Sequence, residues 1–151
     1  MIRDKVVLGG FVGVLSMLAK DVFEFPLWRL KMVKHPLAHY AASLFMDPKS
    51  VHNSFIGQII SLFADLAYGL FWGIVFVYLI YLTGKGHFLL KGLMFGAFLW
   101  FFSFGVLRSL AMVTLRETVA ANSLYYLLIH LIFGLALGFT MKILNQRKLI
   151  D

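Results

Sequence analysis

Two ionisable residues, Asp65 and His130, stand inside long apolar runs of the sequence. Each is followed by glycine four and eight residues later, at Gly69 and Gly73 and at Gly134 and Gly138. On a helix, residues four apart lie on one face, so each set forms a stripe. A carboxylate and an imidazole in an apolar run are a candidate functional site, because together they can relay a proton or hold a cation.

Three further charged residues are expected near this pair. Lys20 lies only about 20° round the helix from the glycine stripe of the first apolar run, and Glu24 and Arg108 fall toward the same membrane face. We therefore predict an intramembrane polar cluster with Asp65 and His130 at its core and the other three at its rim. The cluster is either functional or a structural clamp that fixes the register of the helices, and the rim side chains can also reach the headgroups.

The composition identifies the medium in which these groups lie. Of the 151 residues, 61% are hydrophobic and 14% are charged, against roughly 45–50% and about 25% in soluble domains. This indicates an integral membrane protein with membrane lipids as its surroundings. The net charge of +7 is explained by membrane orientation and anionic lipid, so no nucleic-acid partner is predicted.

Four apolar runs predict four transmembrane helices, at about residues 5–25, 54–82, 87–113 and 123–144. The fold class is therefore all-α, a four-helix transmembrane bundle that forms a single domain over residues 1–151. The first helix should end before Pro26, because the residue before a proline disfavours the helical conformation. Its basic start also fits a signal peptide, but Met17 stands where cleavage after Ala19 would need a small residue, so we favour a retained helix.

The connection between the first two spans is too charged to cross a membrane. Residues 27–46 carry an amphipathic stripe and the aromatic residues Trp28 and Tyr40, which predicts an interfacial segment anchored by these two rings. An ordinary connector is the alternative. The stripe consists of Leu37, Tyr40, Ala41, Leu44 and Phe45.

Every predicted span carries one Gly-x-x-x-Gly motif, a pattern that lets two helix backbones approach closely in lipid. The alternative is that glycine is simply common in transmembrane helices. The pairs are Gly9/Gly13, Gly69/Gly73, Gly92/Gly96 and Gly134/Gly138. Aligning Asp65 with His130, and Gly9 with Gly92, also permits a tandem repeat of two-helix hairpins.

Four crossings place both termini on one side of the membrane. The short turn at Lys85 and the final residues Arg147 and Lys148 on that side are basic. We therefore predict a multi-pass protein of the cell membrane with cytoplasmic termini.

Metal and cofactor sites are not predicted. His35 and His39 are four residues apart and His52 lies nearby, but Pro36 interrupts the pair and the sequence places no third ligand. These three histidines are the weakest candidates, and no cofactor is expected.

Parts of the chain resemble known bacterial membrane proteins. Gly9-Gly-Phe-Val-Gly13 with Lys20 and Glu24-Phe-Pro26 resembles the first span of the YagU-like inner-membrane proteins. Gly57-Gln-Ile-Ile-Ser61 and Lys91-Gly-Leu-Met-Phe-Gly-Ala-Phe-Leu-Trp100 resemble the YqhR-like proteins of spore-forming bacteria. The resemblance implies a small polytopic protein of the bacterial inner membrane and carries over no functional residues.

These observations predict a non-enzymatic membrane protein, an accessory, structural or stress-related component with a polar cluster. The alternative is an oligomeric transporter or channel for protons, cations or a small solute that uses Asp65 and His130. Self-association or membership of a larger membrane complex fits either role, since a chain this small has little room for an aqueous pathway of its own.

Overall fold

The computed structural model describes residues 4–33, 35–107 and 120–149, and the regular elements of this part are all helices. The described part of the chain is therefore all-α, as predicted. In chain order the elements are α1 (Lys5–Arg29), α2 (Leu37–Ala42), α3 (Pro48–Asn53), α4 (Phe55–Thr83), α5 (Phe88–Trp100), the π-helix η1 (Phe101–Leu107) and α6 (Ala120–Gln146).

Four helical stretches are long and apolar enough to cross a membrane, and the third of them joins α5 to most of η1. They are Lys5–Arg29, Phe55–Thr83, Phe88–Val106 and Ser123–Gln146. Large apolar side chains cover the outside of the bundle; Val22, Phe63 and Met94 are 69%, 67% and 65% exposed. In a bilayer such side chains meet lipid tails instead of water, so the fold indicates a multi-pass membrane protein.

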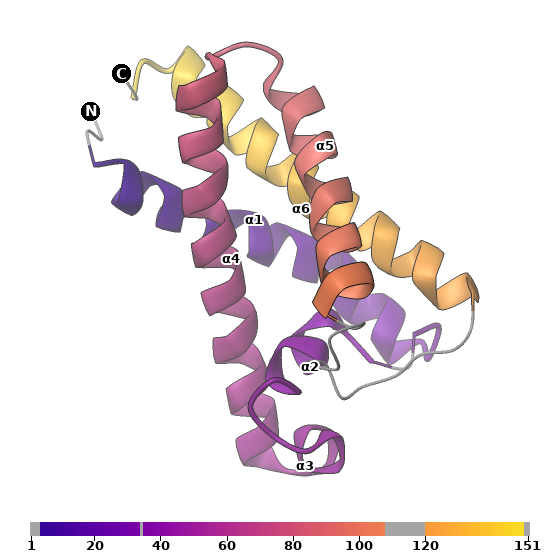
Figure 1. Cartoon of the computed structure of the whole chain (residues 1–151). Coiled ribbons are helices and arrows are strands. Elements are labelled where there is room, and N and C mark those ends of the chain that lie inside the picture. The colour runs from indigo at the N-terminus through magenta and orange to yellow at the C-terminus, as the bar shows by residue number, and fades with distance from the viewer. Residues whose placement is uncertain (1–3, 34, 108–119, 150–151) are drawn as a thin grey trace.

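The long helices pack as two crossing pairs, α1 with α4 and α5 with α6, and α1 also contacts α6 (Figure 1). Aromatic rings bridge α4 and the third span, where Trp72 packs edge-on against Phe95 and Phe102 with centroid distances of 5.9 and 5.7 Å. The buried apolar core draws on all four spans and includes Leu8, Val12, Phe76, Leu99, Phe133 and Leu137.

Glycines lie where the two helices of each pair cross. A Cβ atom added to Gly13 would overlap the carbonyl group of Gly69, and one added to Gly73 would lie 2.6 Å from the backbone nitrogen of Gly13. In the other pair, a Cβ added to Gly134 would lie 2.9 Å from the Cα of Gly96. At these crossings the facing backbone leaves no room for a larger residue. The same holds for Gly9, Gly92 and Gly138.

The two ends of the bundle differ. The first turn of α1, the turn between α4 and α5, and the last turn of α6 lie toward one end, which we call the terminal end (Figure 1). There the ammonium group of Lys5 lies 4.4 Å from the ring centroid of Tyr81, and that of Lys85 lies 5.0 Å from the same ring. The short helices α2 and α3 lie at the opposite end, beside the first turns of α4.

Helix α6 (Ala120–Gln146) extends past the predicted 123–144 helix at both ends, and two other helix boundaries differ from the prediction. Helix α1 continues through Pro26 to Arg29. Pro26 lies in the last turn, so few backbone hydrogen bonds of the helix follow the one that the proline cannot donate. The third span is α-helical only to Trp100 and then becomes the π-helix η1, in which hydrogen bonds close over five residues instead of four. The rest of the predicted 87–113 helix, from residue 108 onward, lies outside the described residues.

Within the predicted segment 27–46, residues 27–29 belong to the last turn of α1, and the described residues Leu37–Ala42 form the short helix α2, which packs on α4. Tyr40, predicted as a membrane anchor, is instead 93% buried, since only 7% of it is exposed. Its ring packs against Phe104 and Tyr126, with centroids 5.3 and 5.1 Å apart. Leu44 and Phe45 remain exposed, so the predicted stripe is divided. Contact of this exposed half with a membrane surface stays a prediction.

Candidate functional site

Lys20 lies at the centre of a buried ion cluster between α1 and α4. Its Nζ atom is 2.6 Å from Glu24 Oε2, 3.1 Å from Asp65 Oδ2 and 2.7 Å from Asp21 Oδ1. Lys20, Glu24 and Asp65 are only 1%, 2% and 4% exposed. An ammonium group has three N–H donors, and this one has three carboxylates around it. The cation is therefore fully engaged.

Helical periodicity brings these side chains together. On α1, the buried residues Gly9, Gly13, Lys20 and Glu24 lie on one face. The helix packs through its glycines, and the two charged residues lie on the same face closer to its C-terminal end. On α4, the buried positions recur every four residues. They are Gly57, Ser61, Asp65, Gly69 and Gly73. Asp65 therefore faces α1 one turn before the glycine crossing.

Glu24 extends the cluster to the connector. Its Oε2 atom is bound to Lys20, and its Oε1 atom accepts a hydrogen bond of 2.7 Å from the backbone N–H of Leu37. Leu37 is the first residue of α2. A single carboxylate thus connects α1 with the segment that covers the end of the bundle.

His130 has a different partner from the one predicted. The predicted core joined it to Asp65, but the structure pairs Asp65 with Lys20. The Nδ1 atom of His130 lies 2.7 Å from the carbonyl oxygen of Tyr126, one turn earlier on its own helix. Its ring also packs edge-on against Phe104, with a centroid distance of 5.9 Å.

The register of the two helix pairs explains this difference. In the first pair, Gly13 faces the carbonyl group of Gly69; in the second, Gly96 faces the carbonyl group of His130. If Gly13 and Gly96 are equivalent, His130 occupies the place of Gly69 and not that of Asp65. The sequence alignment of Asp65 with His130 is therefore one helical turn out of step with the packing. The tandem repeat itself stays a prediction.

An aromatic cluster adjoins the ion cluster at the same end of the bundle. The ring of Tyr126 stacks on Phe104 at 4.7 Å, and its hydroxyl donates a hydrogen bond of 2.9 Å to the carbonyl oxygen of His35. This bond joins α6 to the connector. The hydroxyls of Tyr68 on α4 and Ser103 on η1 form a further link of 3.0 Å.

The remaining predicted candidates are one rim residue and three histidines. Arg108 lies outside the described residues, as does the side chain of His52. The rings of His35 and His39 lie 6.1 Å apart, and among the described residues no three histidine, cysteine or acidic side chains are placed to hold a metal ion. Within the ion cluster, the ammonium group of Lys20 already occupies the centre of the carboxylates.

Several contributors to the site were not singled out from the sequence. The backbone N–H of Leu37 carries no sequence signal, and the Tyr68–Ser103 bond depends on which helices are neighbours. Ser61 could have been found, since it continues the four-residue spacing of Asp65, Gly69 and Gly73 toward the start of α4. Comparison of the chain with protein families, with curated proteins and with solved structures finds no match.

Proposed function

We propose that this chain is a non-enzymatic, multi-pass membrane component, an accessory, structural or stress-related protein whose buried ion cluster fastens its helices together. The observation that carries the proposal is the closed arrangement around Lys20, whose three donors all meet carboxylates. Groups that satisfy one another in this way have little capacity left for a substrate. The resemblance to small bacterial inner-membrane proteins supports a place in that membrane.

The connector adds a second argument for a fastening role. Breaking the contact between Glu24 and Lys20 would also release the carboxylate that holds the first residue of α2. The cluster thus sets the position of two spans and of the surface that covers them at this end. Such a surface, held in one shape, suits contact with a second membrane protein or with another copy of the chain.

A small transporter or channel for protons, cations or a solute is the second candidate. One observation favours it: the buried carboxylates of Glu24 and Asp65 outnumber the single ammonium group of Lys20. An arriving proton or cation would reduce this excess of negative charge. In this role Asp65 would be the principal binding group, and His130 on α6 would be a second titratable group.

Reconstitution into liposomes separates the two proposals. The purified protein is tested for proton and potassium flux under an imposed gradient, beside Asp65→Asn and His130→Gln. Asp47→Asn is the control, because it makes the same charge change at an exposed residue that caps α3. The fastening role predicts no flux above protein-free liposomes. A flux that disappears in Asp65→Asn and persists in Asp47→Asn would instead establish transport.

A further inference from the structure

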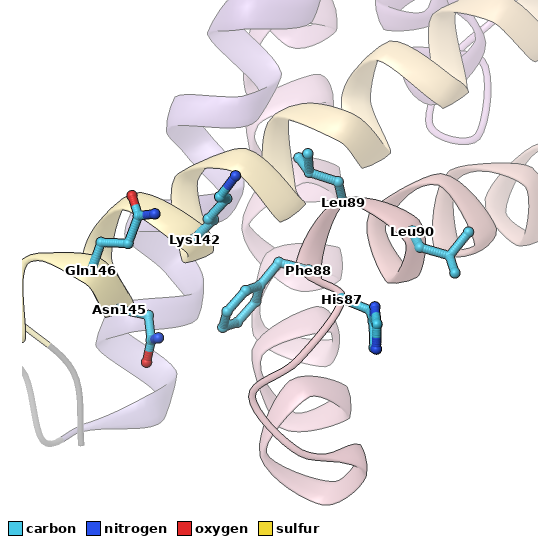
Figure 2. Close-up of a pocket in the computed structure, with 7 residues that line it drawn as sticks. All are labelled: His87, Phe88, Leu89, Leu90, Lys142, Asn145 and Gln146. Carbon is cyan, nitrogen blue, oxygen red and sulfur yellow. The ribbon is translucent and has the colours of Figure 1, made fainter.

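A pocket that shares no residue with the ion cluster lies at the terminal end of the bundle. It has a volume of about 490 Å³ and is formed by the start of α5 and the last turns of α6 (Figure 2). The two helices are in contact beside the pocket, where an added Cβ on Gly138 would overlap the carbonyl group of Phe88. The ring of Phe88 lies between Asn145 and His87 in Figure 2.

The lining of this pocket has two chemical parts. Phe88, Leu89 and Leu90 supply apolar surface at the beginning of a membrane span. A cation and three further polar side chains supply the rest, with no acidic residue among the lining: Lys142, Asn145, Gln146 and His87. A ligand that fits both parts carries an anionic, hydrogen-bond-accepting group next to an apolar one.

Lys142 is the cation at this end that lacks a described partner and faces a pocket. Lys5 and Lys85 pack over the ring of Tyr81, and Lys91 donates hydrogen bonds to the carbonyl oxygens that end α4. The carboxylate described at this end, Asp4, caps the first turn of α1. The charge of the pocket is therefore uncompensated within the described part of the chain.

We propose that this pocket binds the phosphate headgroup of an anionic phospholipid. Lys142 faces the phosphate, Asn145 and Gln146 offer amide donors, and Leu89, which points toward α6 in Figure 2, lies against the glycerol and the upper acyl chain. Basic pockets between transmembrane helices recognise anionic headgroups in this manner. The inference does not depend on the function of the ion cluster.

Lipid binding to delipidated protein in detergent tests this proposal. Native mass spectrometry and thermal-shift titration would compare phosphatidylglycerol, phosphatidylcholine and inorganic phosphate. We expect phosphatidylglycerol to bind the most tightly of the three. We also expect Lys142→Gln to weaken it about five-fold, since one lysine near an anionic headgroup contributes about 1 kcal/mol. Lys148→Gln makes the same charge change outside the pocket and should alter binding less than two-fold.

A second variant keeps the result independent of total charge. Asn145→Leu removes an amide donor while keeping the branched shape and the neutral charge of the side chain, and it should also weaken the binding of phosphatidylglycerol selectively. Equal losses in Lys142→Gln and Lys148→Gln would overturn the site in favour of diffuse attraction. Binding of inorganic phosphate as tight as that of the lipid would overturn the lipid assignment, and so would equal affinity for phosphatidylcholine.

Discussion

Lys20 illustrates how strongly one charged residue depends on its neighbours inside a bilayer. Moving a lone ion into an apolar medium is expensive, and partners with good geometry offset that cost. Glu24 and Asp65 are nearly as buried as Lys20, whereas the side chain of Asp21 is 34% exposed. The three carboxylate partners thus differ in burial, and removing each of them should change the free energy of unfolding by a different amount.

We predict that Lys20→Met lowers the free energy of unfolding by about 3–5 kcal/mol, because it leaves buried carboxylates without a counter-ion. Combining it with Glu24→Gln and Asp65→Asn should restore most of the loss, since a neutral set needs no counter-ion. Unfolding in detergent micelles measures both. Asp21→Asn is the control and should change stability by less than about 1 kcal/mol. A triple variant as unstable as Lys20→Met would contradict this account.

At the scale of the helix, two neighbouring glycines of α1 have opposite surroundings. A Cβ on Gly13 would overlap the backbone of α4, whereas a Cβ on Gly10 would lie 3.6 Å from a side-chain carbon of Leu70, an ordinary contact. The difference separates the effect of helix packing from the effect of glycine on helix formation. The two sites therefore form a matched pair for substitution.

Gly13→Ala should destabilise the protein by about 1–3 kcal/mol, because the added methyl group forces α1 away from α4. Gly10→Ala should leave stability unchanged or raise it by up to about 1 kcal/mol, because alanine favours the helix more than glycine does. Thermal unfolding in one detergent compares them. Equal effects from both substitutions would remove the case for close packing at Gly13.

Much of the helical framework could be predicted from the sequence, because apolar length determines which segments can span a membrane. The position of Lys20 on the glycine face of α1 also followed from helical periodicity. The pairing of Asp65 did not, since it depends on α1 being the neighbour of α4 and on a packing register that is one helical turn out of step with the sequence alignment of Asp65 with His130. The boundary expected at Pro26 was wrong because proline biases a helix without always ending it.

At the scale of the whole molecule, the structure places the start of α1 and the end of α6 with the α4–α5 turn, away from α2 and α3. This arrangement is what four crossings require, but it leaves the direction of insertion open. The sequence contains no cysteine, so single introduced cysteines report position without a background signal. Lys85 and the 73% exposed Phe45 are suitable probes, one for each end.

We predict that Lys85→Cys reacts with a membrane-impermeant maleimide in inside-out vesicles and Phe45→Cys reacts in right-side-out vesicles. The expected direction follows from the basic residues at the terminal end, which favour the cytoplasmic side. Labelling of both from the same side would contradict the four crossings. Labelling of Lys85→Cys in right-side-out vesicles and of Phe45→Cys in inside-out vesicles would agree with four crossings but would reverse the predicted orientation.

The pair formed by Lys20 and Glu24 has a consequence for biogenesis. These residues are four apart on α1, whereas Asp65 lies 45 residues beyond Lys20. A ribosome therefore delivers the local pair to the translocon first, and α1 can partition into lipid with its two opposite charges already matched. When the next hydrophobic segment emerges, we expect its carboxylate to meet a cation that is already in place, which would offset the cost of moving that carboxylate into the membrane.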